Sequence, residues 1–314
     1  MNDLSFEKLE TLVRRHLPEV EGELSFKPVK TGKFNISYFV CVGEEEFVLR
    51  IAPSRDETFV FYERDMMRQE PEIHDLVLSR TSVPVARIIA HDESHELIDS
   101  DFLIMERLPG RPLTEMARVD YGFVLRQVGE YLAQVHSITA EQYGYLGSHC
   151  PMEPQETWAA AFRIMWHKMI DDIVGVGHYD DSESSMLREL LDSRLSYFDR
   201  PIRSSLLHMD IWHQNILVDG EGNVTALVDW DRALWGDVEI EFAVLDYCGI
   251  SEPAFWEGYG CDRDQSQEAR IRQIFYFLYE LQKYIVIRHG RGRNPSAARN
   301  YKRQVMEIVK NYFH

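Results

Sequence analysis

Three side chains between Leu206 and Asp237 have the types and the spacing that a transfer of phosphate requires. Asp210 and Asn215 lie five positions apart, and Asp229 follows fourteen positions later. Such a transfer needs a carboxylate that orients or deprotonates the attacking hydroxyl, and hard oxygen ligands that hold Mg²⁺ against the phosphates. Two carboxylates and one amide oxygen supply groups of these kinds, so the stretch predicts a phosphate-transfer site.

Short strands must bring these three side chains together. Residues 206–210, 215–219 and 224–231 have the apolar, β-branched character of strands, and D-G-E-G-N at 219–223 is typical of a hairpin turn. A tight hairpin folds the chain back, so the residue before its first strand and the residue after its second lie at the same end. We therefore expect the three side chains to meet at one end of a small sheet.

The rest of the chain divides into a β-rich first part and a helix-rich second part. Residues 47–51 and 101–108 read as strands, and 63–80 as a helix that Pro84 prevents from continuing. Apolar residues recur at helical spacing near the N-terminus, where Leu9, Leu12, Val13 and Leu17 share a face, and in four later segments: 125–135, 158–173, 271–285 and 297–312.

This pattern predicts an α+β chain of two lobes. We expect an N-terminal lobe at residues 1–107 and a C-terminal lobe at 108–314, with the Pro- and Gly-containing segment 106–113 as the linker. A length of 314 residues is ample for two lobes.

Composition restricts the classes of partner. Hydrophobic residues make up 45% and charged residues 27%, as in ordinary soluble domains. No apolar run approaches the roughly 20 residues that cross a bilayer, and the N-terminus shows no signal-peptide pattern. The net charge of −18 argues against nucleic acid and anionic membranes as partners, although it also serves solubility. Four scattered cysteines without a C-x-x-C pair predict a reducing, cytoplasmic location. A monomer and a dimer both stay open.

The stretch around Asp210 resembles the catalytic segment of the aminoglycoside phosphotransferase family, small-molecule kinases with a protein-kinase-like fold. The family pattern is H-G-D-x-x-x-x-N, followed later by an Asp in an I-D-W or V-D-W context. The matching residues here are His208, Asp210, Asn215, Asp229 and Trp230, with W-G-D at 235–237 and Glu241-Phe242-Ala243 resembling the continuation. Met209 departs from the pattern, because it stands where the family has Gly.

The resemblance implies a role for each matching residue. Asp210 would be the catalytic base or the group that orients the hydroxyl. Asn215 and Asp229 would be Mg²⁺ ligands, and His208 would brace the loop by hydrogen bonds. Taken singly, an Asp or Asn near a turn is commonly a cap, so the prediction rests on the joint pattern.

The N-terminal lobe would then hold the nucleotide. A kinase needs a backbone loop over the phosphates and a cation that is held by a carboxylate on a helix. Segment 30–40 suits the loop, with a plain hairpin turn as the alternative, and its small or polar residues are Thr31, Gly32, Asn35 and Ser37. The resemblance makes Arg50 the cation and Glu70 its partner, with Glu72 and Glu63 as competing choices.

The segment 101–113 resembles the family's hinge, where backbone groups bind the purine edge. The positions concerned include Glu106 and Leu108. Because backbone recognition leaves little side-chain signature, ATP is the predicted nucleotide and GTP stays open, with Mg²⁺ as the metal.

The acceptor is the least determined part of the prediction. Members of the family phosphorylate hydroxyls of small molecules, and carboxylates at Asp231, Glu239 and Glu252 would suit the ammonium groups of an aminoglycoside antibiotic. Choline bound by aromatic rings, homoserine, a sugar-like metabolite and a macrolide are alternatives. A non-catalytic nucleotide-binding pseudokinase is disfavoured by the complete residue set, and a hydrolase does not explain the β-rich lobe.

Overall fold

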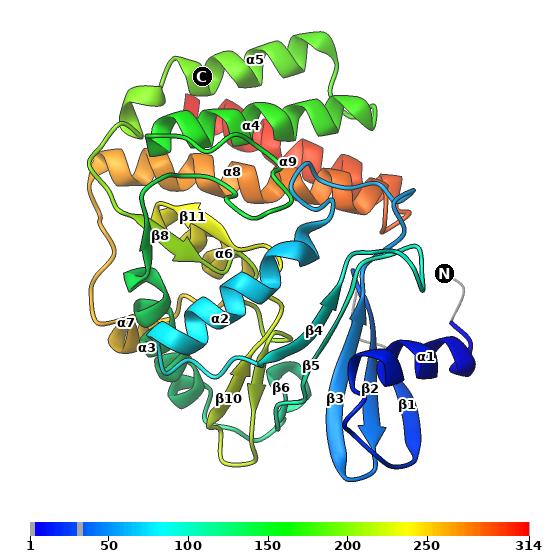
Figure 1. Ribbon diagram of the computed structural model, residues 1–314. Helices are drawn as coiled ribbons and strands as arrows, with labels where there is room; N and C mark the ends of the chain where they lie inside the picture. The colour runs from blue at the N-terminus through cyan, green and yellow to red at the C-terminus, as the bar shows by residue number, and fades with distance from the viewer. Residues whose placement is uncertain (1–3, 30–33, 314) are drawn as a thin grey trace.

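The computed structural model of the chain describes residues 4–29 and 34–313. An antiparallel sheet of five strands, in the order β1-β2-β3-β5-β4, forms one end of the molecule, and most of the helices form the other (Figure 1). The predicted α+β arrangement is confirmed. The strands of this sheet are β1 (Leu24–Val29), β2 (Ile36–Val42), β3 (Glu45–Ile51), β4 (Ile88–Asp92) and β5 (Phe102–Glu106).

Helix α1 (Phe6–His16) covers one face of this sheet. Its apolar side chains Leu9, Leu12 and Val13 are buried in one cluster with Val40 and Leu49 of the sheet, as the spacing of the apolar residues predicts. The predicted lobe boundary at 107/108 falls just after β5, and it stays a prediction.

Helix α2 (Glu70–Arg80) is shorter than the predicted helix at 63–80, so that prediction is wrong at its start. Asp65 has a left-handed backbone with φ of 57°, which interrupts any helix that begins earlier. The preceding segment instead packs Val60 and Tyr62 into the large core of the C-terminal part. Tertiary packing therefore overrides the local helical pattern at these positions.

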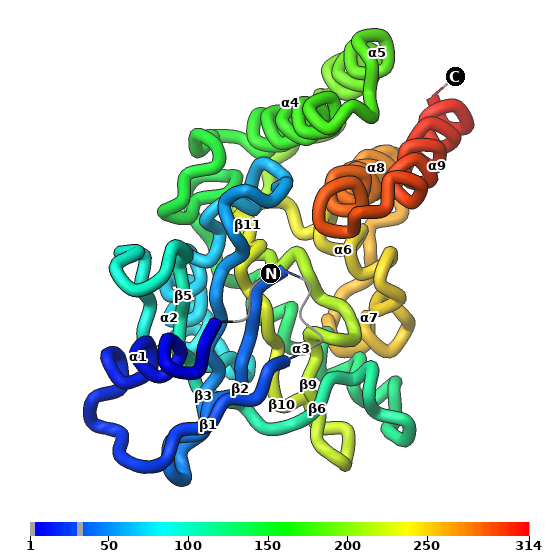
Figure 2. Tube along the Cα trace, turned by 90° about the vertical axis from the view of Figure 1, so that its right-hand side faces the viewer, coloured from blue at the N-terminus to red at the C-terminus, as the bar shows by residue number. Residues whose placement is uncertain are grey.

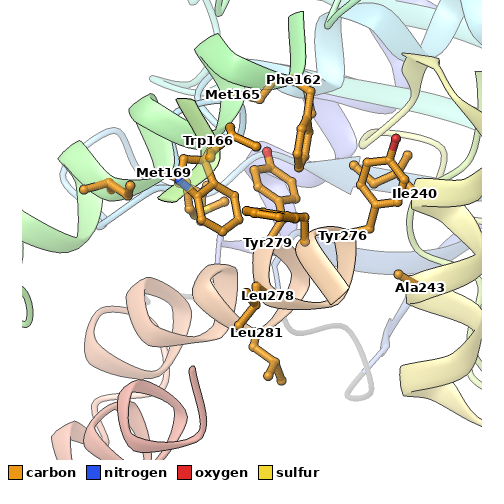
Figure 3. Close-up of a cluster of buried hydrophobic side chains, with 14 of the residues drawn as sticks. Phe162, Met165, Trp166, Met169, Ile240, Ala243, Tyr276, Leu278, Tyr279 and Leu281 are labelled. Atoms are coloured by element: carbon orange, nitrogen blue, oxygen red, sulfur yellow. The ribbon is translucent and has the colours of Figure 1, made fainter. Parts of the chain in front are cut away.

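The C-terminal part is built from helices, and four of them lie at the four predicted segments. Figure 3 shows part of its core, where Phe162 and Trp166 lie close to Tyr276 and Tyr279. Among the described helices, none combines the length and apolar character that crossing a bilayer requires. The helices are α3 (Tyr121–Ser137), α4 (Trp158–Gly175), α5 (Asp181–Asp192), α6 (Val238–Cys248), α7 (Pro253–Tyr259), α8 (Gln267–His289) and α9 (Pro295–Phe313).

Two small sheets lie among these helices, one in the order β10-β9-β6 and one in the order β11-β8-β7. Strands β9 and β10 form the predicted hairpin, and β6 pairs with β9 directly after the hinge. The loop that carries Asp210 therefore runs from the second sheet to the first. The strands are β6 (Arg111–Pro112), β7 (Thr139–Ala140), β8 (Ser204–Leu207), β9 (Ile216–Val218), β10 (Val224–Leu227) and β11 (Leu234–Gly236).

Candidate active site

The loop between β8 and β9 brings Asp210 and Asn215 together, as predicted. The side-chain amide of Asn215 donates to the Asp210 carbonyl oxygen at 2.9 Å and to Asp210 Oδ2 at 3.2 Å. The Val228 N–H, at the end of β10, donates to the Asn215 carbonyl oxygen at 3.0 Å. The hairpin thus places Asp229 at the same end of the sheet as Asn215.

His208 connects this loop to the end of β10 from a fully buried position. The Asp210 N–H donates to His208 Nδ1 at 3.3 Å, so the proton on the ring lies at Nε2, which donates to the Val228 carbonyl oxygen at 3.1 Å. Burial lowers the pKa of His208, which favours this neutral ring. These contacts fit the bracing role that the resemblance implies.

Met209 occupies the position of the family's Gly with a left-handed backbone, at φ of 63°. Its side chain is buried in the large C-terminal core. The N–H groups of His208 and Met209 donate to the two carboxylate oxygens of Glu241, at 3.1 and 2.7 Å. Burial opposes the ionisation of Glu241, but His136 at 2.7 Å and the Met209 N–H hold the pKa of Glu241 below its ordinary value. The charged Glu241 thus fixes the backbone of the loop.

Arg50 joins the two lobes through three carboxylates. Its guanidinium lies 2.5 Å from Glu70, 2.5 Å from Asp229 and 3.2 Å from Asp231. The predicted Arg50–Glu70 pair is therefore present. The competing choice Glu72 lines a cavity of about 490 Å³ beside Ile138 and Trp235.

The charges around Arg50 are not all equivalent. Burial opposes the ionisation of Glu70, yet Arg50 beside it holds the pKa of this carboxyl below its ordinary value. Burial, reinforced by the charges of Asp229 and Glu70, raises the pKa of Asp231 well above its ordinary value despite Arg50. Burial thus favours the protonated form of Asp231, whereas Arg50 favours the ionised form of Glu70.

Asp231, which we predicted as an acceptor ligand, contacts two residues of the N-terminal lobe. Its Oδ2 contacts Arg50 and accepts a hydrogen bond from the Asn35 side chain at 3.2 Å. Asn35 thereby ties the predicted phosphate loop to the residues after β10. Ser37 lies in β2 directly opposite Arg50, whereas the other two predicted loop residues lie outside the described residues: Thr31 and Gly32.

The hinge packs beside the sheet through hydrogen bonds and apolar contacts. The Glu106 N–H donates to the Arg87 carbonyl oxygen at 3.0 Å, and the Glu106 carboxylate accepts from the Arg87 N–H at 3.2 Å. Leu108 is half-buried in the cluster that contains Leu103 and Met105. The assignment of Glu106 and Leu108 to the nucleotide stays a prediction.

The remaining oxygens of Asn215 and Asp229 suit a hard cation. Asn215 donates through its amide nitrogen, and Asp229 contacts Arg50 through Oδ1. Within residues 4–29 and 34–313, no hydrogen bond reaches Asn215 Oδ1 or Asp229 Oδ2. Mg²⁺ is usually bound by one or two such groups together with the phosphates of the substrate, so this donor set fits.

Two of the predicted acceptor ligands, Glu239 and Glu252, have surroundings that differ from those of Asp231. Glu239 is buried against Arg272, whose guanidinium donates to both carboxylate oxygens at 2.7 and 2.9 Å, and it also pairs with Arg200 at 3.0 Å. Glu252 is exposed at the residue that precedes α7. Among the described residues, no hydrogen bond or ion pair joins either carboxylate to Asp210, and their assignment to acceptor binding stays a prediction.

Two contacts of the site were not foreseen from the sequence. Arg232 donates from Nη1 to Asp210 Oδ1 at 2.9 Å, and the buried side chain of Gln69 donates to the Asp231 carbonyl oxygen at 2.6 Å. The signal for Arg232 is its place three residues after Asp229, which puts it on the same turn. Gln69 carries no comparable signal, because its partner lies far away in the chain.

Known proteins resemble this chain over much of its length. The profile of the phosphotransferase enzyme family matches residues 25–273. A Vibrio parahaemolyticus protein named "Probable ketoamine kinase" is 25% identical over 80% of this chain and 82% of its own length. Hygromycin-B 4-O-kinase of Escherichia coli is 25% identical over 68% of this chain and 59% of its own length.

Solved structures agree on the fold. The crystal structure of aminoglycoside phosphotransferase APH(4)-Ia superimposes with a TM-score of 0.66 at 19% identity, over 99% of this chain and all of that one. A thermostable mutant of the same enzyme, in a ternary complex with AMP-PNP and hygromycin B, gives 0.62 at 20% identity over 96% and 99%. At these identities the likeness establishes the shared architecture.

Proposed function

Because the chain belongs to the phosphotransferase enzyme family and is a small-molecule phosphotransferase, we propose that it moves the γ-phosphate of ATP to a hydroxyl of its substrate. The observation that supports this proposal best is the cluster at Arg50, whose guanidinium contacts both Glu70 and Asp229. A cation suited to phosphate, its helical partner and a candidate metal ligand share one place between the lobes. A transfer of phosphate needs these groups together.

The chain's own residues divide the work. Asp210 orients the acceptor hydroxyl and takes its proton, while Asn215 holds Asp210 Oδ2. Arg50 binds phosphate oxygens through the forked geometry of its guanidinium. Asn215 and Asp229 would hold Mg²⁺, which neutralises the charge on the phosphates when it is bound. His208 and Glu241 keep the loop in place through its backbone.

The acceptor in this proposal is a hydroxylated amine. The named relatives include a ketoamine kinase and a hygromycin kinase, and these acceptors combine hydroxyl groups with amine nitrogen. The net charge of −18 favours a cationic molecule by long-range attraction. An aminoglycoside and a sugar-derived ketoamine are therefore the two acceptors to test first.

The test is the release of ADP from Mg²⁺-ATP, with GTP in parallel, against a panel of acceptors. The panel contains aminoglycosides, a ketoamine, choline, homoserine, a neutral sugar and a macrolide. We expect turnover with an aminoglycoside or the ketoamine, and we expect Asp210→Asn to lower kcat by at least about 100-fold. Turnover confined to choline, homoserine, the neutral sugar or the macrolide would refute the proposed acceptor class.

Nucleotide binding is measured separately from turnover. Saturation with Mg²⁺-ATP at about 100 times its Kd should stabilise the wild type by about 2.7 kcal/mol. Asp210→Asn should keep this stabilisation, because Asp210 is assigned to the acceptor hydroxyl. A protein that binds nucleotide but releases no ADP with any acceptor would favour the non-catalytic alternative.

A further inference from the structure

A network of alternating charges, here called the charge network, leads away from Asp210. Arg232 Nη1 lies 2.9 Å from Asp210 Oδ1, and Arg232 Nη2 lies 3.3 Å from Glu63 Oε1. Arg291 is the last member of the charge network, and its two terminal nitrogens each lie 2.9 Å from an oxygen of Glu63. Two carboxylates and two guanidiniums thus alternate, and their formal charges cancel.

These four residues come from three separate parts of the fold. Glu63 lies between β3 and α2, Asp210 and Arg232 follow β8 and β10, and Arg291 lies between α8 and α9. Figures 1 and 2 show the segment after β3 passing beside the end of α8. A Cβ on Gly290 would lie only 2.4 Å from Thr58 Cβ, so the two segments are in close contact.

The four side chains of the charge network are buried or nearly buried. The side chain of Glu63 has no exposed surface, and those of Arg232, Arg291 and Asp210 are 11%, 12% and 17% exposed. Glu63 Oε2 also accepts the Val60 N–H at 3.0 Å, which fixes the orientation of its carboxylate. Buried charges with several partners hold their geometry far better than exposed pairs do, because removing one partner leaves the other uncompensated.

We propose that Arg232 is a positioning residue for Asp210, and that Glu63 and Arg291 hold Arg232 in place. Asp210 Oδ2 contacts Asn215 at 3.2 Å and Oδ1 contacts Arg232, so the carboxylate is held from both sides. Its rotation about the side-chain bond is thereby restricted. This inference rests on the proposed function, since it concerns the group that orients the acceptor hydroxyl.

The charge network also reaches the predicted phosphate loop. The Arg291 guanidinium lies over the ring of Phe34, 4.4 Å from its centre, and Phe34 directly follows the undescribed segment 30–33. The placement of Asp210 is therefore tied to the start of β2 as well as to the catalytic loop. Glu63, a competing partner for Arg50 in the sequence, has this separate task in the structure.

The first measurement is steady-state kinetics on Arg232→Met, Arg232→Lys and Glu63→Gln, with Asp210→Asn as the reference. We expect Arg232→Met to lower kcat by about 10- to 100-fold, because a displacement of about 1 Å can cost 100-fold. Arg232→Lys keeps the charge but replaces two forked nitrogens by one, so it should recover part of kcat. Glu63→Gln, which does not touch Asp210, should lower kcat by at least about 3-fold.

The nucleotide distinguishes positioning from a general loss of structure. The KM for ATP should stay within about 3-fold in all three variants, since Arg50 and Asp229 are not altered. Arg15→Met serves as the matched control, because Arg15 forms an exposed pair with Glu96 at 2.6 Å. If Arg232→Met matches the kcat of this control while Asp210→Asn is inactive, the inference is overturned and the proposed function stands.

The second measurement needs no acceptor. Unfolding constants of the wild type, Asp210→Asn, Arg232→Met and the double variant form a cycle that isolates the interaction of the pair. If the two single effects were additive, they would predict an unfolding constant for the double variant. We expect the measured unfolding constant to be lower than this value by about 3-fold or more. If the effects of the two substitutions on stability simply add, the inference is overturned, whether or not any acceptor is turned over. The absence of turnover with every acceptor would instead count against the proposed function alone.

Discussion

Met209 allows the backbone of the catalytic loop to be tested separately from its chemistry. The residue has φ of 63°, a region that side chains with a Cβ enter at a cost of about 1–2 kcal/mol. Its side chain is only 5% exposed and lies in the large core. Strain in the backbone and burial of the side chain therefore act in opposite directions at one position.

Two substitutions separate these contributions. Met209→Ala removes the buried side chain, which costs about 2–5 kcal/mol, and keeps the strain because alanine has a Cβ. Met209→Gly also removes the side chain, but it relieves the backbone strain. The greater freedom of glycine in the unfolded chain reduces this gain in stability by about 0.4–1 kcal/mol. The expected order of stability is wild type, then Met209→Gly, then Met209→Ala, with about 1 kcal/mol between the two variants.

Urea unfolding at one pH measures the three free energies of unfolding. Ala133→Gly in α3 is the control, since glycine in an ordinary helix is less stable than alanine by about 0.8–1.0 kcal/mol. The preference for alanine should thus reverse between the two positions. If Met209→Ala is as stable as Met209→Gly or more stable, the loop is not strained at this position and the reasoning is wrong.

Three further predictions follow from buried charges. Arg50→Met should lower the free energy of unfolding by about 3–5 kcal/mol, because it leaves a buried carboxylate without its partner; an unchanged thermal midpoint would contradict this. Burial raises the pKa of Asp172 to about 7, so its contribution to stability falls as pH rises from its ordinary value of 3.8 through about 7. Asp172→Asn should therefore raise the midpoint relative to wild type at pH 8 and not at pH 4, and an equal effect at both pH values would exclude this cause. Glu239→Gln should cost a similar 3–5 kcal/mol and leave the acceptor KM unchanged, whereas a raised KM at unchanged stability would return Glu239 to the acceptor site.

Local spacing explains which parts of the site could be predicted. Asp210, Asn215 and Asp229 are positioned by one short loop and one hairpin, whose turn and strand residues are adjacent in sequence. The Arg50–Glu70 pair spans only the segment between β3 and α2, and the family pattern supplies its spacing. Such features depend on short stretches of chain, which composition and periodicity describe well.

The remaining contacts depend on packing between distant segments. The pair of Glu63 and Arg291 joins residues that are separated by most of the chain, and no periodicity links them. The start of α2 was predicted wrongly for the same reason, because Val60 packs into a core made mostly of residues from the C-terminal lobe. Glu239 was taken for a free acid because its partner Arg272 lies on another helix.

The packing of Val60 and Tyr62 has a consequence for how such chains recombine. Both residues precede the predicted lobe boundary, yet they are buried in the C-terminal core, where the Tyr62 ring stacks on that of Tyr145 at 4.7 Å. A chimera that took residues 1–107 from this chain and the rest from a distant relative would set these side chains against a surface shaped for others. We therefore expect exchange of lobes between relatives to succeed only when the segment around Val60 comes from the same protein as the C-terminal lobe.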